Sequence, residues 1–471
     1  MSERRVESPS DDVDRQLYAK RQKIYPREVH GIFALLRTSA VLLLLGLYYF
    51  SPWLYWDGRQ AILFDLPERK FYLFDLIIWP QDFIYLSALL IIAAMSLFFF
   101  TALAGRLWCG YACPQTVWTE AFLWIERKIE GSRQKQIKRD KAPLTLNKFV
   151  VKASKHAVWI LFSLWTGFTF VGYFTPILEL ANKIVHFNTG PWETFWVLFY
   201  GLATYGNAGW LREQVCIYMC PYARFQSAMV DANTLIISYD SVRGEPRGPR
   251  KKGIDPADVE LGSCIDCTIC VQVCPTGIDI RDGLQYQCIG CAACIDACDD
   301  VMEKMNYPKG LIRYTTQKAL AGEDTHVLRP RMFVYAGLMI VVVTAVLFGL
   351  LTRDVIGLDV IRDRNALYRE TGDGLIENVY TLKIVNMDGE AHVFDVDIDG
   401  LDGAQLVEDG DSVEVESGRV VSYVVRVQVD PNRMTQQSSD FMFRIHSPTA
   451  PGLDAEENAR FVGPRWLGTG S

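Results

Sequence analysis

The stretch 264–275 reads CIDCTICVQVCP, and a second stretch with the same cysteine spacing, CIGCAACIDAC, follows at 288–298. Each contains the pattern Cys-x2-Cys-x2-Cys-x3-Cys, with which two-cluster ferredoxins hold a pair of 4Fe–4S clusters. Three thiolates on a short loop bind three irons of one cluster, and the fourth cysteine of each run binds the other cluster. The predicted ligands are Cys264, Cys267, Cys270 and Cys298 for the first cluster, and Cys288, Cys291, Cys294 and Cys274 for the second.

A zinc ribbon or a disulfide framework is the alternative interpretation of these eight cysteines. A structural zinc ion takes four ligands in a closed tetrahedral site, which leaves the repeated run of four unexplained. Reduced, metal-binding thiols are typical of a cytosolic environment, where disulfides are rare. We therefore expect an iron–sulfur protein that transfers electrons one at a time.

Composition and charge indicate a chain with both membrane and soluble parts. Half of its 471 residues are hydrophobic, although 22% are charged. The formal net charge of −7 is unevenly distributed: residues 353–471 contain 22 acidic and 11 basic residues, a net −11, which leaves +4 for residues 1–352. Such an asymmetry predicts that the two parts face different compartments. We expect a membrane and proteins as partners, and no nucleic acid.

Five segments are long and apolar enough to cross a bilayer, for which an α-helix needs ~20 residues. They are 33–53, 83–103, 157–178, 192–210 and 332–352. The loop 106–156 contains 11 Lys and Arg against 4 Asp and Glu, and the positive-inside rule places it in the cytoplasm. The N-terminus and the cluster cysteines then lie in the cytoplasm, and the C-terminal segment lies in the periplasm. No cleavable signal peptide precedes the first span, so we expect a multi-pass protein of the bacterial inner membrane.

After the fifth span, short runs of alternating apolar and polar residues predict an antiparallel β-sandwich. The runs are 379–387, 392–398, 412–416, 420–429 and 441–447. The segment has no cysteine, so its immunoglobulin-like character is inferred from the number of strands alone. No glycine-rich fingerprint follows a predicted strand, and a built-in nicotinamide or flavin domain is not expected.

The predicted fold is therefore a multidomain membrane protein. It combines a five-helix transmembrane bundle, a cytoplasmic ferredoxin module with two 4Fe–4S clusters, and a periplasmic β-sandwich. The predicted domains are a cytoplasmic tail (1–32), a four-helix membrane region (33–238), the ferredoxin-type module with its linkers (239–330), a fifth transmembrane helix (331–352) and the β-sandwich (353–471).

The other four cysteines form a second repeated motif, Cys-x3-Cys-Pro. One copy lies in RLWCGYACP (106–114) and the other in REQVCIYMCP (212–221), each beginning with an arginine at the end of a predicted span. Cysteines four residues apart share one face of a helical turn, and the proline marks the end of that turn. Two such turns at the same membrane depth bring four thiols together: Cys109, Cys113, Cys216 and Cys220.

Four adjacent thiols suit a soft metal ion such as Cu(I), or zinc, or an iron–sulfur cluster. We expect the nearby Arg106, Arg212 and Arg224 to favour the thiolate form. The alternative is that the cysteines are inert and pack as small hydrophobic residues. Duplication of the whole motif favours a site, but its spacing leaves open whether the site holds copper, an additional cluster or redox-active thiols.

Three local motifs, KIYPR (23–27), GLIRY (310–314) and NVYTLK (378–383), and the order of the domains resemble the CcoG family of cytochrome c oxidase accessory proteins, also called FixG or RdxA. The resemblance covers nearly the whole chain and all twelve cysteines. It implies an oxidoreductase, a cupric reductase that converts Cu(II) to Cu(I) for the assembly of cbb3-type cytochrome c oxidase. It also implies a cytoplasmic electron donor, and copper-delivery proteins and oxidase subunits as partners. The implied copper or redox thiols are Cys109, Cys113, Cys216 and Cys220.

Two other functions remain open. Electron conduits of the NapH type also pair span-end Cys-x3-Cys-Pro motifs with two clusters, and they take electrons from quinol to another redox protein. That family generally lacks the large outer β-domain. A non-catalytic assembly scaffold, which would hold oxidase subunits through the β-domain, would tolerate the loss of cluster ligands.

Overall fold

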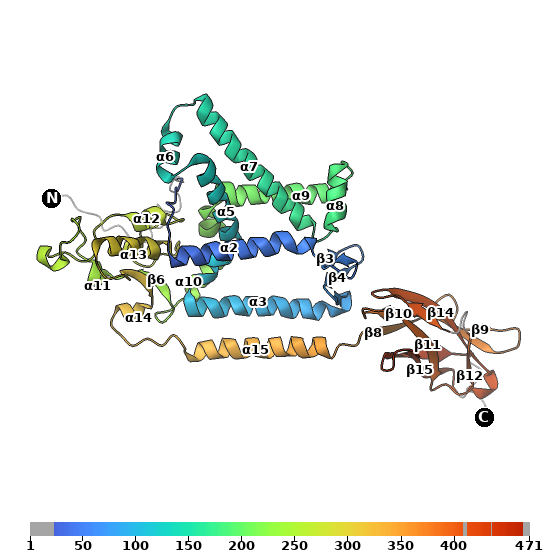
Figure 1. Cartoon of the computed structure of the whole chain (residues 1–471). Coiled ribbons are helices and arrows are strands. Elements are labelled where there is room, and N and C mark those ends of the chain that lie inside the picture. Colours follow the sequence, from blue (N-terminus) through green and yellow to red (C-terminus); the bar gives the residue numbers. More distant parts are fainter. Residues whose placement is uncertain (1–22, 408–411, 435, 465–471) are drawn as a thin grey trace, which may run out of the picture. The chain divides into compact units, whose positions relative to one another are not determined.

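The computed structural model describes residues 23–407, 412–434 and 436–464 (Figure 1). The described residues form two compact units. The first unit contains residues 23–69 and 82–343, and the second contains residues 70–81 and 344–464. Most of the predicted cytoplasmic tail, residues 1–22, lies outside the described part of the chain.

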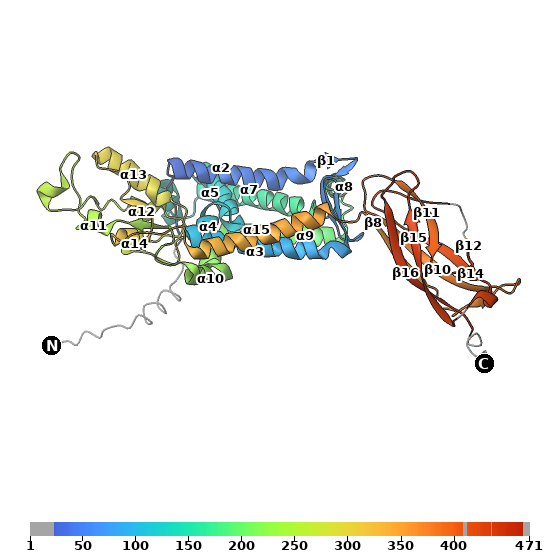
Figure 2. The same ribbon diagram turned by 90° about the horizontal axis from the view of Figure 1, so that it is seen from below.

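Three helices are long and apolar enough to cross a membrane. They are α2 (Ile32–Phe50, extended to Trp53 by a 3-10 turn), α3 (Phe83–Ala104) and α15 (Pro330–Leu351). Each span has 22 residues, which at 1.5 Å per residue corresponds to ~30 Å, the thickness of a bilayer core. α3 and α15 lie side by side in both views (Figures 1 and 2). These helices correspond to the first, second and fifth predicted spans.

The third and fourth predicted spans have a different form. α7 (Leu146–Val171) begins before the predicted span and ends before it does, so its first turns include lysines. α9 (Pro191–Thr204) has only 14 residues and continues as a π-helical segment, Tyr205–Leu211. Within the described residues, neither helix meets the length and composition of a membrane span. The five-helix bundle therefore stays a prediction.

α7 and α9 nevertheless pack closely, because glycines bring their backbones together. A Cβ on Gly167 would lie 2.2 Å from the carbonyl oxygen of Val197, and one on Gly201 would lie 3.3 Å from that of Ser163. α5 (Pro114–Glu130) packs against the other side of α7 through apolar side chains. This three-helix contact positions the segments that carry the Cys-x3-Cys-Pro motifs.

Short elements join these helices in the first unit. The helices are α4 (Leu107–Tyr111), α6 (Arg133–Lys141), α8 (Ile177–Val185), α10 (Pro221–Met229), α11 (Ser241–Gly244) and α14 (Gln317–Leu320), with a π-helical turn at Val215–Met219. Further 3-10 turns lie at Pro256–Val259 and Ile280–Asp282. The short strands are β1 (Tyr55–Trp56), β2 (Arg59–Gln60) and β3 (Ile62–Asp65), of which β1 and β2 pair antiparallel.

The ferredoxin module consists of loops around two helices and a strand pair. α12 (Ile269–Val273) and α13 (Ala293–Met305) each begin just after a residue with left-handed backbone, Thr268 and Ala292. The strand before the module, β6 (Ile236–Tyr239), pairs antiparallel with the strand after it, β7 (Ile312–Thr315). The two cysteine runs therefore fold in the same way, as a loop that turns into a helix.

The second unit is a sandwich of two antiparallel sheets, which confirms the predicted β-sandwich. One sheet has the order β12-β14-β10-β8, with β9 beside β10, and the other has the order β13-β11-β15-β16. The strands are β8 (Ile356–Arg362), β9 (Arg369–Glu370), β10 (Ile376–Asn386), β11 (His392–Asp399), β12 (Ala404–Val407), β13 (Val413–Val415), β14 (Val420–Val429), β15 (Ser438–His446) and β16 (Asp454–Val462). Alternate residues of β10 are buried, and its Tyr380 packs between Phe441 and Phe443 of β15. This period of two is what the sequence runs predicted.

A hairpin from between the first two spans also belongs to the second unit. β4 (Lys70–Leu73) and β5 (Leu76–Ile78) pair antiparallel. Ile77 and Trp79 pack against Val385 of β10 in one buried apolar cluster, and the guanidinium of Arg353 donates to the carbonyl of Ile77 at 3.0 Å. This part of the segment between the first two spans therefore belongs to the β-domain fold.

Candidate iron–sulfur and thiol site

The eight cysteines of the two runs line two neighbouring cavities. Cys264, Cys267, Cys270 and Cys298 line one of them. Cys274, Cys288, Cys291 and Cys294 line the other, to which Cys270 also contributes. The last cysteine of each run thus faces the loop of the other run, because α12 and α13 lie against each other. The tertiary structure brings together both predicted sets of four.

Burial raises the pKa of several of these thiols, because an isolated thiolate loses its hydration. The pKa of Cys291 and Cys298 rises to about 12 for this reason. Burial has the same effect on Cys270, which also reaches a pKa of about 12 although Arg281 acts in the opposite direction. A metal ligand must be a thiolate, so bound iron has to supply the compensating positive charge.

The donor set fits two clusters better than two single ions. Within the described residues, no three His, Cys, Asp or Glu side chains are close enough together to hold one metal ion. Four thiols around a cavity instead suit a larger cage, and thiolate is the usual ligand of 4Fe–4S clusters. All twelve cysteines are free of disulfides. When bound, such clusters supply one-electron redox chemistry. The chain's own residues set how far apart the two clusters lie and how well solvent is kept away from them.

The two Cys-x3-Cys-Pro motifs share a local design. Cys113 is the residue before α5, and Cys220 is the residue before α10; both have extended backbone. The following residues, Pro114 and Pro221, are the first residues of those helices. Proline suits this position because it lacks an N–H that the helix could not use, and it holds the preceding residue extended. In both motifs, the proline begins a new helix as well as ending the turn before it.

The four motif thiols are electrostatic neighbours, although no three of them, as placed in the described residues, are close enough to hold one metal ion together. When ionised, Cys109, Cys113 and Cys220 each act electrostatically on Cys216, and Cys113 and Cys220 act on Cys109. Burial is the main cause that raises the pKa of Cys109 and Cys216 to about 12. Two motifs that are more than a hundred residues apart in the chain therefore form one group, here called the thiol group.

Of the three arginines expected to favour the thiolate form, Arg106 acts in that direction, although its effect is outweighed. Arg106 lowers the pKa of Cys109 and Cys216, but burial outweighs it and the net shift is upward. The guanidinium of Arg212 instead donates to Glu126 at 2.8 Å and to the carbonyl of Gly209 at 2.9 Å. The side chain of Arg224 lies outside the described part of the structure. The pKa values of Cys109, Cys113 and Cys216 are all raised, so without a bound metal these three thiols favour the neutral form.

The thiol group adjoins the second cluster cavity. Cys109 and Cys216 pack against the apolar cluster that contains Cys291, Val273 and Ile289. The hydroxyl of Thr116 donates to the carbonyl of Cys109 at 2.6 Å and fixes α4 against α5. The order in space is therefore first cluster cavity, second cluster cavity, thiol group.

A buried charge network that the sequence analysis missed supports this arrangement. Glu126 of α5 pairs with Arg212 at 2.8 Å and with Lys155 of α7 at 3.2 Å. Burial acts to raise the pKa of Glu126, but Arg212 and Lys155 lower it to about 2. In the sequence, the signal for this network was Arg212 at the start of the second motif. Its partner, Glu126, lies 86 residues earlier in the chain.

Comparisons with known proteins identify iron–sulfur domains in the same parts of the chain. A family model described as a 4Fe–4S dicluster domain matches residues 211–317, which include all eight cluster cysteines together with Cys216 and Cys220. A model described as a 4Fe–4S binding domain matches residues 86–131, which include Cys109 and Cys113. A third model, the Ig-like fold at the C-terminus of FixG, matches residues 346–464.

Whole-chain relatives extend the similarity. The nitrogen fixation protein FixG of Rhizobium meliloti is 38% identical over 93% of this chain and 92% of its own length. Protein RdxA of Cereibacter sphaeroides is 39% identical over 95% of this chain and 99% of its own length. The ferredoxin-type protein NapH of Haemophilus influenzae is 24% identical over 41% of this chain and 56% of its own length.

Proposed function

Since the chain belongs to the FixG and RdxA family of iron–sulfur proteins, we propose that it reduces Cu(II) to Cu(I) for the assembly of a cbb3-type cytochrome c oxidase. The proposed copper site is the thiol group, and the proposed cluster ligands are the two sets of four cysteines. The observation that carries the proposal is the contact of the thiol group with the apolar cluster around Cys291. The thiols that would hold copper are therefore next to a proposed ligand of the second cluster, from which the electron would come.

The chemistry of the thiol group supports copper as the substrate. Thiolates retain Cu(I) far better than Cu(II), so a thiol site favours the reduced product. Copper binding displaces protons from buried thiols, whose pKa is raised by burial. The step is Cu(II) plus one electron to Cu(I), and the protein gains no atom from it. Thr116 and Arg106 hold α4, and so Cys109, in place through backbone contacts.

Two contacts support the proposed topology, with the clusters in the cytoplasm and the β-sandwich in the periplasm. The backbone N–H of Ala34, in the first turn of α2, donates to Asp296 of the ferredoxin module at 2.7 Å. At the other end of the first two spans, the hairpin with Ile77 belongs to the β-domain. On this proposal, α2 begins on the cytoplasmic side and the hairpin lies on the periplasmic side.

The test of the proposal combines copper and iron measurements. Purified protein is reduced anaerobically with dithionite, freed of reductant and given Cu(II), while the Cu(II) EPR signal is followed. We expect loss of that signal in the wild type and its persistence when Cys109, Cys113, Cys216 and Cys220 are all serine. The serine variant should keep its two clusters, about eight irons per chain. Unchanged Cu(II) reduction by that variant would disprove the copper assignment.

A second candidate is a NapH-like conduit that passes electrons to another redox protein. The similarity to NapH, which covers 41% of this chain, favours it. The same measurement on the wild type distinguishes the two functions, because a conduit without copper chemistry would leave the Cu(II) signal intact. A third iron–sulfur cluster on the thiol group would instead appear as about twelve irons per wild-type chain.

A further inference from the structure

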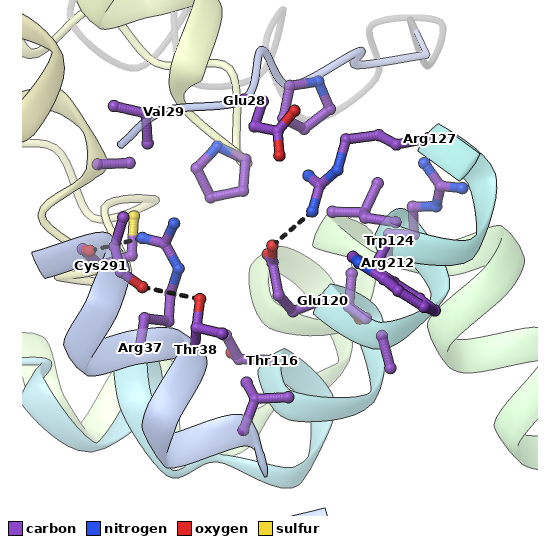
Figure 3. Close-up of a pocket in the computed structure, with 18 of the residues that line it drawn as sticks. Glu28, Val29, Arg37, Thr38, Thr116, Glu120, Trp124, Arg127, Arg212 and Cys291 are labelled. Carbon is purple, nitrogen blue, oxygen red and sulfur yellow. Dashed lines mark hydrogen bonds and ion pairs between the residues drawn. The ribbon is translucent and has the colours of Figure 1, made fainter. Parts of the chain in front are cut away.

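A large cavity lies between α2, α5 and α7 in the first unit. Its volume is about 1100 Å³, just above the ~300–1,000 Å³ that ligand pockets usually have. Figure 3 shows Arg37 and Thr38 of α2 on one side of this space and Glu120 of α5 on the other. The proposed copper chemistry leaves this space without a role.

One part of the cavity is an apolar channel along α2. The helix lines this channel from Leu35 to Leu45, which at 1.5 Å per residue is ~15 Å. That length matches one leaflet, which is half of the ~30 Å hydrocarbon core of a bilayer. Opposite α2 lie Leu161 and Trp165 of α7. Leu42, Leu161 and Trp165 are also exposed on the outer surface, so the channel is continuous with the apolar surface of a candidate membrane span.

The other part of the cavity lies around the start of α2 and contains three cationic or titratable side chains. Arg27 and His30 precede the helix, Arg37 lies in its second turn, and all three line the cavity. Within the described part of the chain, none of the three forms an ion pair. The guanidinium of Arg37 donates one hydrogen bond to the carbonyl of Cys291 at 2.9 Å. Since a guanidinium has five N–H groups, Arg37 can also donate to a bound anion.

Carboxylates line the same cavity but do not cancel its positive charge. Glu120 is held by Arg127 at 3.0 Å, so these two charges offset each other. Arg212 is paired at 2.8 Å with Glu126, which lies outside the lining. With His30 neutral, the lining has one net positive charge, from Arg27, Arg37, Arg127 and Arg212 against Glu28, Glu120 and Glu213. This balance suits a head group with a single negative charge.

The order of the two parts is that of a phospholipid in a membrane. The cations lie where a span begins, and the apolar side chains follow over the depth of one leaflet. On the proposed topology, this end of α2 is cytoplasmic. Basic pockets between membrane helices on that side bind anionic lipid head groups.

We propose that this cavity binds an anionic phospholipid of the inner leaflet, of the phosphatidylglycerol type. Its phosphate accepts hydrogen bonds from Arg37 and lies near Arg27 and His30, and one acyl chain lies along α2 and α7. Because Cys291 also lines the cavity, the lipid joins the first span to the loop of the second cluster. The inference uses the proposed cytoplasmic side of α2 and is independent of the copper chemistry.

The charges of the cavity favour this lipid over two other membrane molecules. A zwitterionic head group would bring its own cation beside Arg27 and Arg37, and like charges repel. A neutral head group would leave the same side chains without an anion at the edge of a low-dielectric bilayer, where an uncompensated charge is costly.

The first experiment uses the full-length protein in phosphatidylcholine nanodiscs that contain a trace of diazirine-acyl phosphatidylglycerol. We expect photolabelling of peptides from 32–50 and 146–171, which excess unlabelled phosphatidylglycerol removes and added phosphatidylcholine does not. In Arg27→Gln, this labelling should fall about fivefold, the effect of ~1 kcal/mol for one cation near an anionic lipid surface. Lys135→Gln is the matched control, because Lys135 is an exposed cation of α6 that does not line the cavity.

A second pair of variants tests the apolar channel. Leu42→Trp narrows the channel, and labelling should fall about tenfold, the effect of ~1.4 kcal/mol. Leu43→Trp is its control, because Leu43 is a similarly exposed neighbour that does not line the cavity. Labelling in Leu43→Trp should equal that of the wild type.

Each contrary outcome identifies a different occupant and overturns the inference. Equal competition by both phospholipids would show ordinary boundary lipid. Displacement by decylubiquinol would show a quinone site, and displacement by inorganic phosphate would show a site for a soluble anion. An equal loss in a variant and its control would place the lipid elsewhere. If dithionite-reduced protein converts Cu(II) but shows no specific labelling, this inference fails while the proposed function stands.

Discussion

Gly110 of α4 lies directly against Gly290 of the second cluster loop. A Cβ on Gly110 would stand 2.8 Å from the carbonyl oxygen of Gly290 and 3.0 Å from the Cα of Cys291. The two backbones can approach this closely only because neither residue has a side chain. Gly290 also has φ +70°, a conformation that glycine adopts without strain. The contact sets the separation between the thiol group and the second cluster cavity.

Replacing Gly110 by alanine should therefore push α4 away from the cluster loop. We expect a loss of stability of ~1–3 kcal/mol, as for other overpacked contacts, and slower Cu(II) reduction with both clusters retained. Stopped-flow mixing of reduced protein with Cu(II) measures the rate, and thermal unfolding measures the stability. Gly337→Ala is the control, because a Cβ there meets nothing within 4 Å. Equal rates for the two variants would show that this contact does not set the electron path.

The prediction that the fourth cysteine of each run binds the cluster of the other run, here called the exchange, can be tested by pairs of serine variants. Cys298→Ser should remove the same cluster as Cys264→Ser, because both residues line one cavity. Cys274→Ser should remove the other cluster, although it is closer in sequence to Cys264. Each variant should retain about four irons per chain. EPR spectra of the reduced proteins identify which cluster remains, and matching spectra for Cys274→Ser and Cys264→Ser would contradict the exchange.

Removing the charge of Glu126 should destabilise the first unit. Glu126→Gln leaves Arg212 and Lys155 buried with one negative partner fewer, and breaking a buried pair costs ~3–5 kcal/mol. Thermal unfolding in detergent measures the loss. The control is Glu303→Gln, which removes a carboxylate from the exposed ion pair with Lys309 and should change stability little. Comparable losses in both variants would argue against a special role for the buried network.

The same carboxyl group should give the protein a pH-dependent stability. The folded state lowers the pKa of Glu126 from 4.5 to about 2, because Arg212 and Lys155 stabilise its charged form. Its contribution is therefore present above about pH 4.5 and is lost as the pH falls towards 2. The difference in stability between wild type and Glu126→Gln should shrink across this window. A difference that stays constant from pH 6 to 3 would contradict the assignment, and unfolding at stepped pH values measures it.

The hairpin of residues 70–81 should contribute to the stability of the second unit. Ile77 is 1% exposed and packs against Val385, so Ile77→Ala should cost ~2–5 kcal/mol through the cavity that it leaves. Ile361→Ala, at a position that is 44% exposed, is the matched control and should cost much less. Limited proteolysis and thermal unfolding report on the β-domain. If both variants unfolded alike, the hairpin would be an accessory rather than a part of the fold.

Features that depend on local spacing or periodicity could be predicted from the sequence, whereas contacts between residues far apart in the chain could not. The cluster ligands, the β-sandwich and three of the spans depend on local spacing and periodicity, and the structure contains the corresponding groups and elements. Strands β8, β9, β12 and β16 were missed, because short or edge strands carry little alternation. The role of Arg212 was assigned to the thiols, whereas its carboxylate partner lies on another helix. No pattern near Arg212 in the chain identifies Glu126.

The sequence by itself indicated the family, contained the repeated Cys-x3-Cys-Pro motif and predicted the two sets of 4Fe–4S ligands. A cluster imposes its own geometry on the cysteines that bind it, so a few residues of spacing carry the information. The sequence predicted that four distant cysteines gather, but only the tertiary structure decided that Cys109 and Cys216 lie beside Cys291 and that a large cavity reaches the same place. Those relationships arise where α2, α4, α5 and α7 pack together. Packing between distant helices depends on side-chain shape and burial, which leave no periodic signal in one chain.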